Sequence, residues 1–147
     1  MSEIINPQDA ELEEIILGSC LIESKAITLI ADILRPEAFY NEKNLEIYAT
    51  LQSMYRNGQK IDIITVKEEL ARRGKLEFIG GPYTLAHISG RVASSAHLEY
   101  HARILKQKYI RRETILVFHK QLAFAADENT EIDQKNTQTN KQQKRLK

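Results

Sequence analysis

Two histidines four residues apart, His97 and His101, are the first residues whose types and spacing suggest chemistry. Residues at i and i+4 share one face of a helix, and two imidazoles on one face can bind Zn²⁺. In the zinc-protease motif H-E-x-x-H, however, the glutamate follows the first histidine directly. Here Glu99 stands two positions after His97, about 200° around a helix from it. We therefore predict no metal site, and keep a zinc hydrolase as an alternative.

A second chemical possibility is phosphate binding at the two glycines Gly80 and Gly81, which stand directly before Pro82. Backbone amides at a helix N-terminus can bind a phosphate, but a Walker loop requires G-x-x-x-x-G-K-[ST]. The one Gly-Lys pair of the sequence, at residues 74 and 75, is followed by leucine and lacks the earlier glycine. We predict that Gly80 and Gly81 form a turn into a helix, and that this chain binds no ATP, Mg²⁺ or other cofactor.

No residue stands out as a catalytic nucleophile, acid or base. Cys20, the single cysteine, lies in an apolar helical pattern without a basic neighbour, which predicts a small core residue rather than a reactive thiol. One cysteine also excludes a disulfide within the chain, as is typical of a reducing compartment. We predict that the chain has no catalytic residues.

The densest run of cations lies between residues 103 and 112, with tyrosines interleaved. Such a stripe can bind phosphates, but its cations scatter over a wide helical arc and the net charge of the chain is only +1. The pattern favours the polar face of an amphipathic helix. A helical nucleic-acid-binding module remains the alternative, and its candidate phosphate contacts are Arg103, Lys106, Arg111 and Arg112.

Helix caps and breakers predict the elements that would position these residues. Residues 1–95 divide into about five short helices, beginning near Pro7, Ser24, Asn41, Asp62 and Pro82. Asn6 is the predicted N-cap of the first, and Pro36 ends the second. No pair of strands with turn chemistry is present, so the fold class is predicted to be all-α, with a compact helical head at 1–95.

After the head, residues 96–126 contain no glycine or proline and predict one long helix, about 45 Å at 1.5 Å per residue. Its apolar positions widen along the chain, so we expect this helix to project and to need a partner surface. The remaining segment, 127–147, is rich in Gln, Asn, Thr and Lys, and is predicted to be a polar, flexible tail that packs weakly at best. No apolar run is long enough for a membrane span and no signal pattern precedes the head, so we expect a cytoplasmic protein.

Four ordered segments, ILRPEAFY, G-x-x-IDIITVKEEL, IGGPYTLAHI and SSAHLEYHARI, resemble the N-terminal domain of the DnaB-type replicative DNA helicases over about residues 6–127. The resemblance implies a helical head followed by a helical hairpin. In that family the hairpins pair and build a collar on a hexameric ring, which serves ring assembly and, in bacteria, docking of primase or a helicase loader. ATP hydrolysis belongs to a separate RecA-like domain, which the 147 residues are not expected to contain.

This resemblance implies that the long helix is the first arm of the hairpin and pairs with other copies, while DNA is contacted only indirectly. The second arm of the family is apolar-periodic, whereas residues 127–147 are not. The residues of the long helix that we expect to pack within and between subunits are Tyr100, Ile104, Leu105, Tyr109, Ile115, Phe118 and Leu122.

Overall fold

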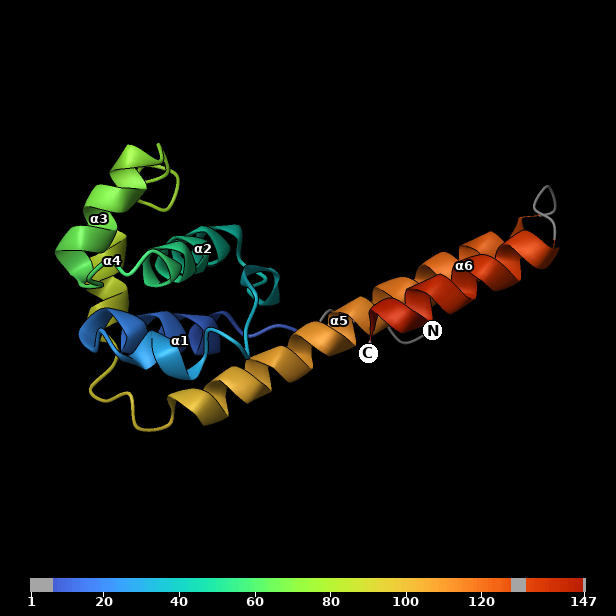
Figure 1. The fold of residues 1–147 in the computed structure, drawn as a ribbon, viewed down its shortest axis with the longest axis horizontal. Coiled ribbons are helices and arrows are strands. Elements are labelled where there is room, and N and C mark those ends of the chain that lie inside the picture. The colour runs from blue at the N-terminus through green and yellow to red at the C-terminus, as the bar shows by residue number, and fades with distance from the viewer. Residues whose placement is uncertain (1–6, 128–131, 147) are drawn as a thin grey trace. The chain divides into compact units, whose positions relative to one another are not determined.

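The computed structural model describes residues 7–127 and 132–146, and within these ranges every regular element is helical (Figure 1). The predicted all-α class is therefore confirmed. The α-helices are α1 (Ala10–Ile22), α2 (Glu42–Arg56), α3 (Ile63–Arg72), α4 (Pro82–Gly90), α5 (Leu98–Ala126) and α6 (Ile132–Arg145), and the 3-10 helices are η1 (Ala26–Leu29) and η2 (Pro36–Ala38).

The chain forms two compact units, and the division falls inside the continuous helix α5, between Tyr109 and Ile110. The head unit is Gln8–Tyr109. Among the described residues, the hairpin unit contains Pro7 with residues 110–127 and 132–146. The boundary between head and long helix that the sequence predicts at residue 95 stays a prediction.

Side-chain caps set where the helices of the head begin. Asn41 accepts hydrogen bonds from the backbone N–H groups of Lys43 and Asn44, and Asp62 forms a reciprocal capping box with Thr65. Both starts match the prediction. The predicted cap of the first helix was wrong, because Asp9 is the N-cap of α1 and accepts from the Leu12 N–H at 3.0 Å. Asn6 lies outside the described residues.

The predicted helix from Ser24 to Pro36 is also only partly present, as the short η1 followed by turns. Two carbonyl groups of this segment, those of Ala31 and Leu34, accept hydrogen bonds from α2 instead of continuing a helix. The Tyr48 hydroxyl donates to Leu34 O at 3.0 Å, and the Gln52 amide donates to Ala31 O at 3.1 Å and to Leu34 O at 3.3 Å. Tertiary hydrogen bonds therefore replace part of the helical ladder here.

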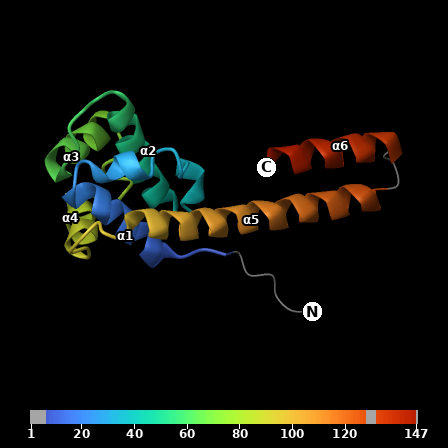
Figure 2. The ribbon, with the colours of Figure 1, turned by 60° about the horizontal axis from the view of Figure 1, so that its bottom comes forward.

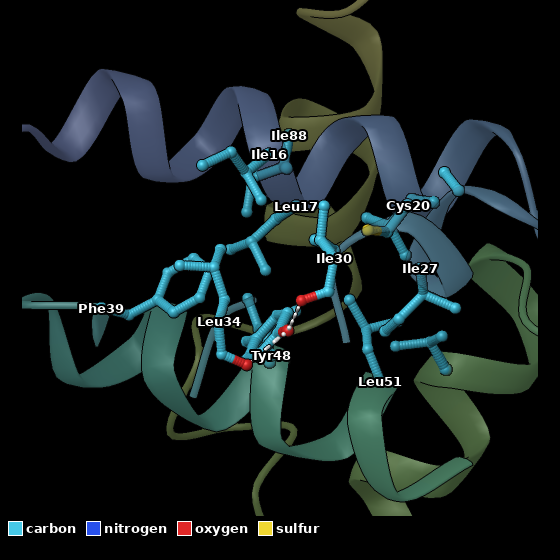
Figure 3. Close-up of a cluster of buried hydrophobic side chains, with 14 of the residues drawn as sticks. Ile16, Leu17, Cys20, Ile27, Ile30, Leu34, Phe39, Tyr48, Leu51 and Ile88 are labelled. Carbon is cyan, nitrogen blue, oxygen red and sulfur yellow. Dashed lines mark hydrogen bonds between the residues drawn. The ribbon is translucent and has the colours of Figure 1, made fainter. Parts of the chain in front are cut away.

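The head core is a single apolar cluster to which α1, α2, the η1 segment, α3, α4 and the start of α5 all contribute. Figure 3 shows the part of this cluster around Tyr48. Tyr48 lies at its centre, stacked on Phe39 with ring centroids 4.7 Å apart. Helices α1 and α4 approach closely at Gly18, where an added Cβ would lie 2.6 Å from Ile88 O. The fully buried side chains with the largest volumes are Tyr48, Phe39, Ile16, Leu17, Ile27, Ile30, Leu34, Ile47, Leu51, Met54, Leu70 and Ile79.

A buried carboxylate fastens α1 to the start of α2. Glu13 is fully buried, and its two oxygens accept from the Tyr40 N–H at 2.8 Å, the Asn41 N–H at 3.2 Å and the Asn44 side-chain amide at 3.1 Å. The negative charge thus sits at the positive end of the α2 dipole. Burial of this charge is tolerated because three donors surround it.

The two glycines that raised the question of phosphate binding shape a turn between α3 and α4. Gly80 and Gly81 have φ angles of 105° and 80°, which residues with a side chain rarely adopt, and Pro82 follows at the first helical position. The predicted turn is confirmed.

In the hairpin unit, α6 runs beside the C-terminal part of α5, as both views show (Figures 1 and 2). Gln121 of α5 is hydrogen-bonded to Thr139 and Gln142 of α6. The segment expected to be a tail thus contains a 14-residue helix that packs through polar groups. Its expected flexibility stays a prediction.

Candidate protein–protein interface

The first turns of α5 belong to the head core, not to a free surface. Leu98, Ala102 and Leu105 are each at most 1% exposed, and they recur at the spacing of one helix face. Leu105 is therefore already buried by its own chain and serves packing inside the subunit. Ile104 and Tyr109 are partly buried against the same core. Of the predicted interface residues in this part, Tyr100 alone is largely exposed, at 66%.

A second face of α5 is covered by α6. Thr114, Val117, Gln121 and Phe124 are all half-buried and recur every three or four residues, so they share a face. Gln121 provides the hydrogen bonds to α6, which identifies this face as the one within the hairpin.

The remaining apolar side chains of this part of α5 stay uncovered. Phe118 is 65% exposed, Leu122 is 70% exposed and Leu116 is 46% exposed, while Ile115 is half-buried. Phe118 and Leu122 are four residues apart and lie on one face. We call the group Ile115, Phe118 and Leu122 the outer face of α5. Helix α6 leaves this face open, although both helices belong to the same unit.

The predicted phosphate contacts are only partly available. Arg103 forms an ion pair with Glu99 at 3.0 Å, and Arg112 Nη1 donates to the carbonyl oxygen of Pro7 at 2.8 Å. Lys106 and Arg111 are exposed. Lys106 and Arg111 form no ion pair with a described residue, and the phosphate-binding role of the four cations stays a prediction.

The residues that suggested catalysis are placed as follows. The rings of His97 and His101 have centroids 6.3 Å apart, and Glu99 between them pairs with Arg103. Within 7–127 and 132–146, no three His, Cys, Asp or Glu side chains are grouped as metal ligands. Burial raises the pKa of the Cys20 thiol to about 12, so this cysteine is protonated and packs in the core as predicted.

No helix among the described residues is both long and apolar enough to cross a bilayer.

Two features of the hairpin unit escaped the sequence analysis: the helix α6, and the exposed cations Lys141, Lys144 and Arg145 that it carries. The packing side of α6 consists mainly of polar residues such as Thr139 and Gln142. A search for apolar periodicity cannot detect a helix that packs in this way. The spacing of polar residues such as Thr139 and Gln142 was the one signal in the sequence for this helix.

Comparisons with known proteins agree with this architecture. The family model described as DnaB-like helicase N terminal domain matches residues 5–107. The chain is 43% identical over 108 residues to the replicative DNA helicase DnaB of Rhodothermus marinus, and 34% identical over 119 residues to the replicative DNA helicase DnaC of Bacillus subtilis. These matches cover 74% and 78% of this chain, but only 12% and 26% of the relatives.

Solved structures give the same result. The crystal structure of the N-terminal domain of DnaB helicase from Mycobacterium tuberculosis matches with a TM-score of 0.87 and 28% identity, over 94% of this chain and 97% of that one. A DnaB-like replicative helicase, described together with its interactions with primase, matches with a TM-score of 0.77 and 25% identity, over 95% of this chain and 32% of that one. The resemblance read from the sequence is thus confirmed, and the chain belongs to the DnaB-like helicase N-terminal domain family.

Proposed function

We propose that this chain acts in DNA replication as a non-catalytic assembly and docking module of a replicative helicase. In this role it pairs with further copies of itself through the outer face of α5, contributes to a helicase ring, and docks primase or a helicase loader. The observation that carries the proposal is the outer face itself, which α6 leaves exposed within the hairpin unit.

The energetics of this face favour a weak pair that is reinforced in a larger assembly. Fully burying Phe118 and Leu122 would contribute about 1.5–3 kcal/mol for each side chain, and a two-fold pair counts each contribution twice. The gross gain of about 6–12 kcal/mol is comparable with the roughly 4–15 kcal/mol that association costs. Two isolated chains therefore pair weakly, and the contact becomes effective when several copies are held in one ring.

The docking role rests on kinship. The structural relative with 25% identity is described with its interactions with primase, and its fold is shared over 95% of this chain. ATP-driven unwinding, by contrast, requires a nucleotide site, and these 147 residues contain no Walker motif. The chain contributes contacts and not catalysis.

Sedimentation equilibrium at 10 µM to 1 mM protein tests the pairing. The double substitution Phe118→Ser/Leu122→Ser removes the outer face and is expected to abolish self-association. The matched control is Ile64→Ser/Tyr83→Ser, which removes two head side chains of similar exposure, 63% and 76%. A wild-type chain that stays monomeric throughout, or two double variants that associate equally, would contradict the proposal.

A further inference from the structure

The net charge of this protein is positive in the hairpin unit and slightly negative in the head unit. Residues 110–147 contain eight Lys and Arg against five Asp and Glu, whereas residues 8–109 contain thirteen against fourteen. The net charges are therefore +3 and −1. The near-neutral total of the whole chain conceals this asymmetry.

Four of these cations, Lys120 on α5 with Lys141, Lys144 and Arg145 on α6, form what we call the hairpin cation cluster. All four are exposed, and none forms an ion pair with a residue that the structure describes. Gln121 of α5 and Gln142 of α6 are hydrogen-bonded, so these two residues lie opposite each other in the hairpin. Lys120 and Lys141 directly precede them in the sequence and therefore lie at about the same position along the hairpin.

A purely structural role accounts for only part of this cluster. Lys144 and Arg145 lie in the last turn of α6, where cations interact favourably with the helix dipole. Lys120 and Lys141 lie outside that turn. Because like charges at one level of a hairpin repel, an external polyanion would stabilise the arrangement.

The dimensions and composition of the hairpin favour a nucleic-acid backbone as that polyanion. Lys141 to Arg145 spans about 6 Å along α6, and Lys120 lies level with Lys141, so the cluster reaches over about two phosphate spacings of one DNA strand. A membrane surface fits less well, since the exposed apolar residues that it would need, Phe118 and Leu122, lie on the outer face of α5 that we assign to pairing. None of the α6 side chains that the structure describes, at residues 136–145, is apolar.

From these observations we infer that the hairpin binds the phosphate backbone of single-stranded nucleic acid through Lys120, Lys141, Lys144 and Arg145. This contact goes beyond the proposed assembly role, and it uses residues distinct from the outer face of α5. Binding is independent of base sequence, with the affinity typical of non-specific contacts, about 10⁻⁴ to 10⁻⁶ M.

The test is fluorescence anisotropy of a fluorescein-labelled dT20 oligonucleotide, titrated with the 147-residue protein between 25 and 150 mM NaCl. About three phosphate contacts give a slope of log K against log[salt] of about −2 for a single strand. The variant Lys120→Gln/Lys141→Gln/Lys144→Gln/Arg145→Gln is expected to lose most of this slope and at least tenfold in affinity. The control variant is Lys25→Gln/Lys43→Gln/Arg56→Gln/Lys67→Gln, which removes four head cations that form no ion pair with any described residue.

Circular dichroism of both variants first establishes that the helix content is retained. Retained binding by the control, with loss of the slope in the hairpin variant, supports the inference. No dT20 binding by the wild-type chain, or equal weakening by both variants, overturns it. Tighter binding to poly-L-glutamate or to vesicles of phosphatidylcholine with 30% phosphatidylglycerol would also overturn it, in favour of an acidic protein or a membrane. The Phe118→Ser/Leu122→Ser variant should bind dT20 normally, so failure of pairing and failure of binding are distinguishable.

Discussion

Replacing Glu13 by glutamine tests whether the buried carboxylate holds α1 against the start of α2. The side chain is fully buried and accepts three hydrogen bonds, two of them from backbone N–H groups at the start of α2. Glutamine keeps the shape but loses the charge, and its amide NH₂ group must face one of those donors. Hydrogen bonds to charged groups contribute about 1.5–3 kcal/mol each, and a buried donor without a partner costs about 1–3 kcal/mol.

We expect Glu13→Gln to lower the free energy of unfolding by about 3 kcal/mol, a large share of the roughly 5–15 kcal/mol of a typical domain. With a urea m-value of about 2 kcal/mol/M, the midpoint falls by about 1.5 M. Urea unfolding followed by near-UV circular dichroism measures this effect, because Tyr48 and Phe39 are buried and stacked in the head core.

The neighbouring substitution Glu14→Gln is the control. Glu14 is half-buried and forms an ion pair with Arg91, an arrangement worth only about 0–1 kcal/mol. The two variants have the same chemistry at adjacent positions and differ in burial and in donors. Equal midpoints for the two, or a loss below about 0.5 kcal/mol for Glu13→Gln, would refute the argument that three donors stabilise a buried charge.

Two further predictions concern packing and pH. Gly18→Ala should destabilise the head by about 1–3 kcal/mol because the new Cβ meets Ile88 O, whereas Gly90→Ala, which meets nothing within 4 Å, should be neutral or slightly stabilising in the same urea assay. Hydrogen bonds from two arginines lower the pKa of Glu69 from 4.5 to about 2, so its contribution to stability is complete above about pH 4.5 and is lost as the pH falls toward 2. The midpoint difference between wild type and Glu69→Gln should shrink over that interval, and a constant difference would exclude this linkage.

Local signals in the sequence predicted much of the head. The helix starts at Asn41 and Asp62, the turn at Gly80 and Gly81, and the buried place of Cys20 each follow from a residue and its near neighbours. The N-cap of the first helix was predicted at Asn6 but is Asp9, because both residue types cap helices well and local chemistry does not rank them. The η1 segment was overpredicted as a helix because Tyr48 and Gln52, distant in sequence, take its carbonyl groups.

The candidate interface could be predicted only in part. Apolar spacing identified α5 as a helix with more apolar surface than it could need for itself. It did not separate Leu105, which the head buries, from Phe118, which stays 65% exposed. That distinction depends on which turn of the helix meets the head core, a property of three-dimensional packing.

The sequence by itself determined the helical class, most helix boundaries, the family and the absence of a Walker motif, because these depend on residues close together along the chain. The tertiary structure decided how α5 is shared among the head core, the polar contact with α6 and an open outer face. It also brought Lys120 and Lys141 to one level of the hairpin. Contacts between residues distant in the sequence set these features. A polar helix such as α6 has no periodic pattern of apolar residues from which its packing against α5 could be predicted.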